Sequence, residues 1–133
     1  MPLTSLLAVE SAIRAGWSRD TCDPADLPDW TPANPSRGQC GVTALVVHDL
    51  LGGTLLLADV LRTDGSRQGV HWWNRLAGGL DLDLTRAQFT ADEHVQAPRE
   101  LDRPPGDPPR LRVRYLLLRR RVETSLGRVA YRP

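Results

Sequence analysis

A cysteine lies in a glycine-flanked turn, Gly38-Gln39-Cys40-Gly41, directly before an apolar run. The run indicates a helix, and the free backbone N–H groups at a helix N-terminus lower the pKa of a thiol placed there. The pattern therefore predicts Cys40 as a nucleophilic thiolate. The same N–H groups, together with the side-chain amide of Gln39, are expected to donate to an oxyanion. The alternative is a tight turn that contains a small buried cysteine without a chemical role.

A cysteine nucleophile needs a base and a third group that orients the base. His71 and Asp83 are the candidates, because the turn around Ala77 predicts a β-hairpin whose strands bring the two residues opposite each other. A register slip would bring Asp81 forward instead, since Asp81 and Asp83 share one face of a regular strand. Without Cys40, the same pattern fits a solvent-facing histidine beside surface aspartates.

The other histidines are weaker candidates. His48 follows Cys40 by about two helical turns, roughly 12 Å along a helix, which is too far for direct proton transfer. His94 follows two acidic residues in a polar segment and is expected to be solvated. Cys40, His71 and an aspartate are suitable ligand types for a metal, but the sequence lacks the close paired spacing of common zinc sites. We expect neither a metal nor an external cofactor.

Three tryptophans and an asparagine are candidates for binding substrate. Trp72 and Trp73 point to opposite faces if their segment is a strand, so at most one is buried with the core while the other lines a cleft. Asn74 is an alternative partner for His71, although in a strand it points the opposite way, and it is also included among the substrate-binding candidates. Trp30 either plugs the core beneath its loop or forms a cleft wall.

Hydrophobic spacing predicts the elements that position these residues. The expected elements are helices at residues 4–16, 42–51 and 111–122 and strands at residues 55–61, 70–76 and 80–84. Thr4 or Ser5 is expected to cap the first helix, and Gly52-Gly53 to end the second. For the second and third helices, strand is the competing interpretation.

Two stretches are expected to be irregular. Residues 17–37 carry four prolines, and a loop of about 20 residues is uncommon in a compact domain unless it has a function. Residues 97–109 are also rich in proline and are predicted to be a loop. Both loops belong to one predicted domain that spans residues 1–133.

Composition limits the class of protein. The chain has 133 residues, of which 41% are apolar and 25% charged, as in an ordinary globular domain. All 17 basic residues are arginine, which excludes Schiff-base and P-loop lysine chemistry. The net charge of +1 argues against sequence-independent binding to nucleic acid. We find no apolar run that could span a membrane and no secretory signal, so we expect a cytoplasmic protein whose thiols, Cys22 and Cys40, are free.

Several segments between Trp17 and Phe89 resemble a known family. They are residues 17–21, 34–47, 52–53, 71–74, 83–85 and 88–89. Together these segments resemble the YunG family of small bacterial proteins. The order Cys40, His71, Asp83 is also similar to that of transglutaminase-like and other papain-like proteins, in which the cysteine begins a helix. That broader resemblance implies the roles of nucleophile, base and orienting carboxylate for these three residues.

The expected fold is α+β, with the cysteine-bearing helix packed on a small antiparallel sheet. The resemblance implies that this is a papain-like or transglutaminase-like core. The expected function is hydrolysis of an amide or ester, or transfer of its acyl group, on a small-molecule or peptide substrate. One alternative is a non-catalytic ligand-binding or regulatory module on the same scaffold. Another is a structural or partner-binding protein in which Cys40 is only a redox-sensitive thiol. The oligomeric state is left open.

Overall fold

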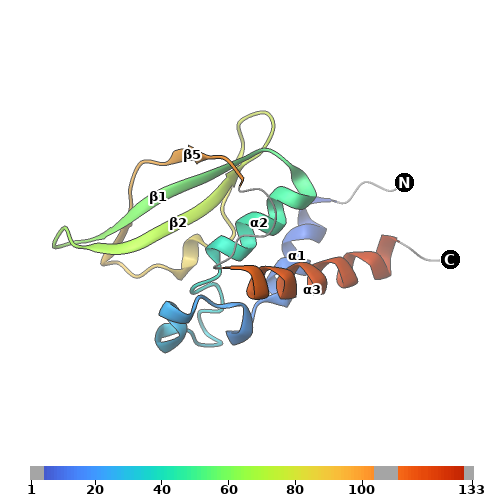
Figure 1. Cartoon of the computed structure of the whole chain (residues 1–133), viewed down its shortest axis with the longest axis horizontal. Coiled ribbons are helices and arrows are strands. Elements are labelled where there is room, and N and C mark those ends of the chain that lie inside the picture. Colours follow the sequence, from blue (N-terminus) through green and yellow to red (C-terminus); the bar gives the residue numbers. More distant parts are fainter. Residues whose placement is uncertain (1–4, 104–110, 131–133) are drawn as a thin grey trace.

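The computed structural model describes residues 5–103 and 111–130, with side chains up to Gly127 in the last helix. Its helices are α1 (Leu6–Gly16), α2 (Cys40–Leu51) and α3 (Arg112–Ala130), and its short 3-10 helices are η1 (Arg19–Thr21), η2 (Pro24–Asp29) and η3 (Arg86–Gln88). Its strands are β1 (Thr54–Arg62), β2 (Arg67–Arg75), β3 (Asp81–Leu82), β4 (Glu93–Val95) and β5 (Arg99–Leu101). The fold is α+β, as predicted (Figure 1).

The strands form one antiparallel sheet in the order β3-β2-β1-β4. β5 pairs with the same edge of β1 as β4 does, but nearer to the start of β1. The long β1–β2 hairpin is its centre. β4 and β5 were not expected, and β5 corrects part of the loop predicted at residues 97–109. Both strands are short and carry no alternating apolar pattern, so the free edge of β1 induces them rather than their own sequence.

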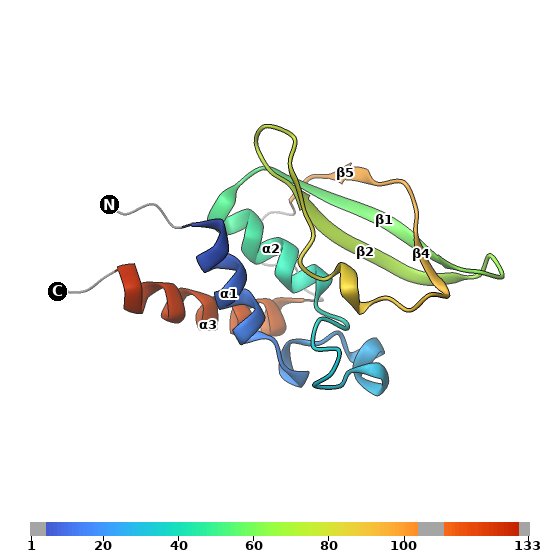
Figure 2. The same ribbon diagram turned by 180° about the vertical axis from the view of Figure 1, so that it is seen from behind.

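The three helices lie on the same side of the sheet, with α2 directly against β2 (Figures 1 and 2). α3 packs against both α1 and α2. The main core lies between these helices and the sheet, and it includes Ile13, Leu45, Leu55 and Leu118. A smaller apolar cluster on the opposite face of the sheet contains Leu56, Ala58 and Trp73. The helical layer therefore covers one face of the sheet, and the smaller apolar cluster occupies the other face.

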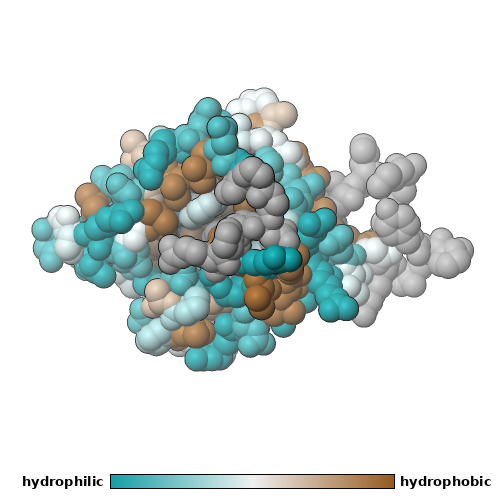
Figure 3. All heavy atoms as spheres, viewed as in Figure 1, coloured by the Kyte–Doolittle hydropathy of each residue, from teal (hydrophilic) through white to brown (hydrophobic). Residues whose placement is uncertain are grey.

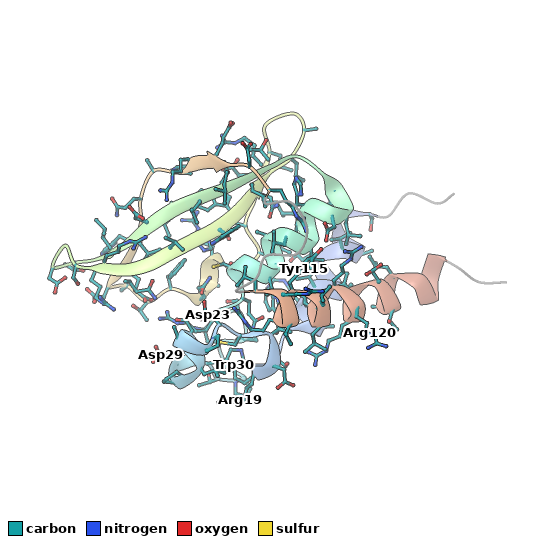
Figure 4. All side chains as sticks on the ribbon, in the orientation of Figure 1. Arg19, Asp23, Asp29, Trp30, Tyr115 and Arg120 are labelled. Carbon is teal, nitrogen blue, oxygen red and sulfur yellow. The ribbon has the colours of Figure 1, made fainter. Side chains whose placement is uncertain are left out.

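The predicted helices are confirmed, and local chemistry explains their limits. The Ser5 side chain accepts a hydrogen bond from the Ala8 N–H group at 3.0 Å, which caps α1. α2 ends at Gly52, whose positive φ of 71° suits glycine. In α3, Tyr115 and Leu118 are fully buried, which confirms a helical stripe over the competing strand. Tyr115 points from α3 toward α2, where its hydroxyl donates to Asp49 (Figure 4).

The loop of residues 17–37 is irregular, as expected, but it is tied firmly to the rest of the chain. The Trp17 indole N–H donates to Thr43 Oγ1 in α2 at 2.9 Å. The side chain of Arg37 is almost completely buried and forms an ion pair with Glu93 at 2.7 Å and with Asp26 at 3.2 Å. These contacts fix η2 next to the N-terminus of α2. In the described part of the chain, no helix has the length and apolar character needed to cross a bilayer.

Candidate active site

Cys40 is the first residue of α2 and opens onto a cavity of about 630 Å³. The cavity lies between η2, the N-terminus of α2 and the outer edge of β2. Its lining includes Cys40, Gly41, Val70, Trp72, Gln88 and Phe89. The sequence predicted that a helix would begin at this cysteine, and the structure confirms it.

Gly38 explains how the chain turns into α2. Its φ of +72° lies in the left-handed region that favours glycine. A side chain there would also collide with the sulfur of Cys22 and with Cβ of Asp26. The turn before Cys40 is thus held by close contact with the preceding loop, and only glycine fits it.

His71 and Asp83 form a hydrogen-bonded pair. His71 Nε2 lies 2.7 Å from Asp83 Oδ2, and His71 is fully buried in the middle of β2. Asp83 Oδ2 also accepts a hydrogen bond from the Arg86 guanidinium at 2.7 Å. Burial opposes the charge on Asp83, but the hydrogen bonds and charges of His71 and Arg86 outweigh burial and hold the pKa of this carboxyl below its ordinary value.

The predicted register that would pair these residues is wrong, although the contact forms. Asn74 pairs with Leu82, and β3 ends there, so Asp83 is not opposite His71 in a ladder. Asp83 instead reaches His71 from the residue just after the strand. Asp81, the competing candidate, pairs with Arg75 and accepts a hydrogen bond from the Trp73 indole at 3.2 Å.

Aromatic rings hold the imidazole in place. Trp73 stacks on the His71 ring with 5.3 Å between centroids, and Phe89 meets it edge-on at 4.8 Å. Because Nε2 faces the Asp83 carboxylate, we assign the proton to Nε2, which leaves Nδ1 as the acceptor. Nδ1 is buried and has no hydrogen-bond partner among the described residues. A buried acceptor without a partner is uncommon and indicates a site that awaits one.

The thiol of Cys40 differs from the sequence prediction. Burial raises its pKa to about 11, and the negative charges of Asp26 and Asp83 add to this effect. Hydrogen bonding from the backbone N–H groups of Trp72 and Gly41 favours the thiolate but does not outweigh burial. The expected lowering of the thiol pKa is therefore wrong, because the prediction counted the helix terminus and not the loss of solvent.

Cys40 and His71 are neighbours without being hydrogen-bonded. The Trp72 N–H group that reaches the sulfur belongs to the peptide bond between His71 and Trp72, so the thiol lies beside the backbone of His71. Nδ1 of His71 nevertheless has no partner among the residues that the structure describes, so no thiol–imidazole hydrogen bond is present. His71 and Asp83 are in direct contact, but neither lines the cavity onto which Cys40 opens, and the His71 ring lies against Trp73, in the cluster on the far face of the sheet.

Gln39 has a different environment from the one expected of an oxyanion donor. Its side chain is fully buried, where Oε1 accepts from Thr21 Oγ1 at 2.7 Å and Nε2 donates to Ser18 O at 2.9 Å. It is not among the residues that line the cavity. The Gln39 amide holds η1 against the start of α2, and its predicted oxyanion role stays a prediction.

Gln88 was given no role by sequence reasoning, although it occupies the position expected of a donor. Its Oε1 accepts the Gly38 N–H group at 3.0 Å, so the amide is fixed to the turn before Cys40. The residue is only 4% exposed and lines the cavity, yet its Nε2 has no partner among the described residues. It lies in the segment shared with the YunG family, which marked the residue without indicating its function.

Of the remaining substrate-binding candidates, one lines the cavity and three do not. Trp72 lines the cavity on the α2 side of the sheet. Trp73 is buried against His71, and Asn74 is buried with its amide donating to Ala44 O at 2.9 Å, so neither side chain faces the cavity. Trp30 is half-buried, donates to Pro35 O and is absent from the cavity lining, so it is neither a core plug nor a wall of this cavity.

Figure 4 shows Trp30 beside Arg19, whose guanidinium lies over the indole at 5.8 Å. The other two histidines lie elsewhere: His48 contacts Arg103, and the exposed His94 contacts Thr63. Residues 5–103 and 111–130 contain no group of three or more His, Cys, Asp or Glu side chains arranged to hold a metal ion.

Comparison with known proteins gives a family. The family described as "YunG protein" matches residues 5–127. This chain belongs to the YunG family. A relative from Bacillus subtilis (strain 168), "Uncharacterized protein YunG", is 37% identical over 95 residues, which cover 69% of this chain and 72% of the relative. No solved structure gives a significant match.

Proposed function

We propose that this YunG-family chain is a thiol-dependent hydrolase or acyltransferase that acts on an amide or ester. The observation that carries the proposal is the buried, unpartnered Nδ1 of His71, on a ring that Asp83 holds through Nε2. A solvent-facing histidine would need neither the stacked indole of Trp73 nor the orienting carboxylate. These contacts fit a general base that is kept in one tautomer.

In the proposed reaction, Cys40 Sγ attacks the carbonyl carbon and its proton passes to His71 Nδ1. The bond from the carbonyl carbon to the leaving nitrogen or oxygen then breaks, and the proton on Nδ1 moves to that leaving group. Water or an amine next attacks the thioester, gives its proton to Nδ1 and releases the acyl group. The Cys40 sulfur regains the proton, so the free enzyme returns unchanged.

The high pKa of Cys40 decides which form of this mechanism applies. With a thiol pKa of about 11, the protonated thiol predominates in the free protein at neutral pH. His71 therefore removes the thiol proton as a general base while the sulfur attacks the carbonyl. No thiolate–imidazolium pair is formed beforehand. The mechanism requires a movement that brings Sγ to Nδ1 when substrate binds, in the way that catalytic hydrogen bonds commonly tighten in the complex.

The oxyanion would be stabilised by donors at the start of α2 and by Gln88. The first N–H groups of a helix have no partner within the helix and carry its positive end. Gln88 Nε2 adds a side-chain donor that is already oriented through the contact of Oε1 with Gly38. Gln39 supports this arrangement by holding the turn, through its bonds to Ser18 and Thr21.

The proposal includes a kinship with papain-like and transglutaminase-like folds. It is supported by the cysteine at a helix start, by the packing of that helix against β2, and by the order Cys40, His71, Asp83 along the chain. The antiparallel sheet and the position of the base on its central hairpin agree with that kinship.

A non-catalytic ligand-binding or regulatory module is the second candidate. One observation favours it, namely the raised pKa of Cys40 together with the missing hydrogen bond to His71. In that case the cavity would bind a ligand without bond cleavage, and His71 would contribute only a polar contact.

Acylation by p-nitrophenyl acetate at pH 7 separates the two candidates, with intact-mass measurement of the protein. An enzyme should acquire one acetyl group on Cys40, and His71→Ala should slow that step by roughly 100-fold or more because the general base is lost. Cys40→Ala should abolish the modification, whereas Cys22→Ala, the matched control at the other thiol, should leave it unchanged. Equal acylation rates in the parent and His71→Ala would favour the binding module.

A further inference from the structure

We propose that the substrate is a polypeptide that binds as an added strand along the outer edge of β2. This inference rests on the proposed acyl chemistry, for which it names the substrate class. Strand addition requires a sheet edge whose backbone N–H and C=O groups lack partners. The same edge must also pass close to the reacting group, which is the Cys40 sulfur.

The outer edge of β2 is open over most of its length. β3 is only two residues long and pairs with β2 at Asn74 and Arg75. From Arg67 to Trp72, no strand of the described chain lies on that side of β2. An open edge of this length is normally covered, blocked by proline or interrupted, and this one carries no proline.

The direction of the backbone groups follows from the ladder. Asp59 is opposite Val70, and the Asp59 carbonyl accepts the Gln96 N–H group at 2.9 Å on the far side of β1. Asp59 and Val70 therefore form a non-hydrogen-bonded pair, and the N–H and C=O groups of Val70 point to the outer edge. Among the described residues, neither group has a backbone partner.

The same alternation places the backbone groups of Trp72 on the outer edge, and there the Trp72 N–H group bonds to the sulfur of Cys40. The row of outward groups therefore ends at the candidate nucleophile. Val70 comes two residues before Trp72, about 6.8 Å along an extended strand. A peptide paired with Val70 would carry its backbone directly to the thiol.

The cavity includes this edge of β2. Its lining includes Gln68, Gly69, Val70 and Trp72 from β2 and extends to Arg67 near the hairpin turn. The lining also contains Asp23, Asp26 and Asp29, and the last two pair with Arg37, which lines the cavity as well. Figure 4 shows Asp23 and Asp29 in the region below β2.

The cavity combines the backbone edge of β2 with apolar side chains such as Trp72 and Phe89, and this combination suits an extended peptide. The hairpin end of the sheet is mainly hydrophilic in the space-filling view (Figure 3), and residues 62–67 are exposed. Paired donors and acceptors repeating every two residues match another strand, whereas a small ligand would use only one such pair. We therefore infer an extended polypeptide and not a free amide or ester of low mass.

Two series of electrophilic peptides test the inference. One series is N-acetylated alanine oligomers of one to four residues with a C-terminal vinyl sulfone, and the other is alanine oligomers with an N-terminal chloroacetyl group. They place the peptide on either side of the bond that Cys40 would attack. The rate constant for labelling Cys40 is measured by intact mass, and peptide mapping confirms that Cys22 is not labelled.

In at least one series, the rate constant should rise roughly tenfold or more between one and three residues, as expected for two added backbone hydrogen bonds. N-methylation of successive peptide bonds should remove the gain at alternate positions only. Val70→Pro should also remove it, since this change deletes an outward N–H group and no ladder bond, while Val70→Thr keeps the N–H group and should retain it.

A rate that is independent of peptide length in both series overturns the strand-addition proposal. Normal acetylation by p-nitrophenyl acetate together with that result would leave the acyl chemistry standing, so the two proposals fail separately. If Val70→Pro does not fold, the N-methyl series decides the question with the unaltered protein.

Discussion

The candidate site has a base side, His71 with Asp83, and a thiol side, Cys40 on the cavity, and the two are prepared for chemistry to different degrees. On the side of the base, His71 is fully buried, bonded to Asp83, stacked on Trp73 and met by Phe89. On the side of the thiol, Cys40 is half-buried, carries a raised pKa and makes no hydrogen bond to the base. The first arrangement is fixed by direct contacts of the functional side chain. The second is held by the backbone turn that precedes it and by backbone N–H groups at the sulfur.

This difference indicates which part of the site must change when a substrate binds. The imidazole is surrounded by groups that would have to break several contacts to move, so it is the rigid partner. The thiol has no hydrogen bond to the base, so it is the partner that has to approach Nδ1. We infer that substrate binding, which excludes water and supplies the carbonyl, completes the site from the thiol side.

Gln88 lines the cavity next to the turn before Cys40, and among the predictions that follow its replacement should have the largest effect. Gln88→Glu keeps the shape of the side chain and the acceptor for Gly38, but it replaces the unpartnered amide donor with an acceptor. If Nε2 binds the oxyanion, kcat for acyl transfer should fall by roughly 100- to 1000-fold, with little change in KM.

The control for this change is Gln96→Glu, at an exposed glutamine whose amide donates only to His94 O. That variant should keep the parent kinetics. If Gln88→Glu raised KM and left kcat intact, Gln88 would be a contact for bound substrate and not a donor to the oxyanion.

The sequence predicted the elements around the site because their signals are local. Ser5, the glycine pair after Leu51 and the spacing of Tyr115, Leu118 and Val122 each act over a few residues, and the structure confirms all three helices. The contact of His71 with Asp83 was also predicted. It followed from a turn signal, which brings its two flanks together even when the exact register is shifted.

The remaining features depend on contacts between distant parts of the chain. β5 forms because β1 offers an edge. The Gln39 side chain bonds to Ser18 and Thr21, which precede it by 21 and 18 residues. The raised pKa of Cys40 comes from burial by several elements. Gln88 could not be recognised as a donor from the sequence, because its role depends on two facts of the structure: its Oε1 accepts the Gly38 N–H group, and its Nε2 has no partner among the described residues.

Alkylation kinetics test whether the thiol side is inactive in the free protein. In a Cys22→Ser background, the rate of reaction of Cys40 with iodoacetamide should rise about tenfold per pH unit from pH 7 to pH 10, because the reactive thiolate is a minor species below a pKa of about 11. An ordinary thiol with a pKa of about 8.5 would level off within that range.

His71→Ala should leave this pH profile unchanged, since no hydrogen bond joins the imidazole to the thiol before substrate binds. The Cys22→Ser background is needed because burial also raises the pKa of Cys22, to about 11. If the alkylation rate instead reached a plateau below pH 8, and the plateau disappeared in His71→Ala, the thiol and the imidazole would form an ion pair in the free protein. The contrast between the base side and the thiol side would then not hold.

The smallest effect is expected from a pair of glycine substitutions that act on the turn before the thiol. Gly38→Ala and Gly65→Ala both place alanine at a positive φ, +72° and +88°, so each should lose about 1 to 2 kcal/mol of folding free energy from backbone strain. An added Cβ at Gly65 meets nothing within 4 Å, whereas at Gly38 it meets Cys22 and Asp26. Gly38→Ala should therefore lose roughly a further 1 to 3 kcal/mol, through overpacking. Urea unfolding of the two variants measures the difference. Equal losses would mean that the loop around Cys22 can withdraw from the turn, and the thiol side would then be held less tightly than its contacts indicate.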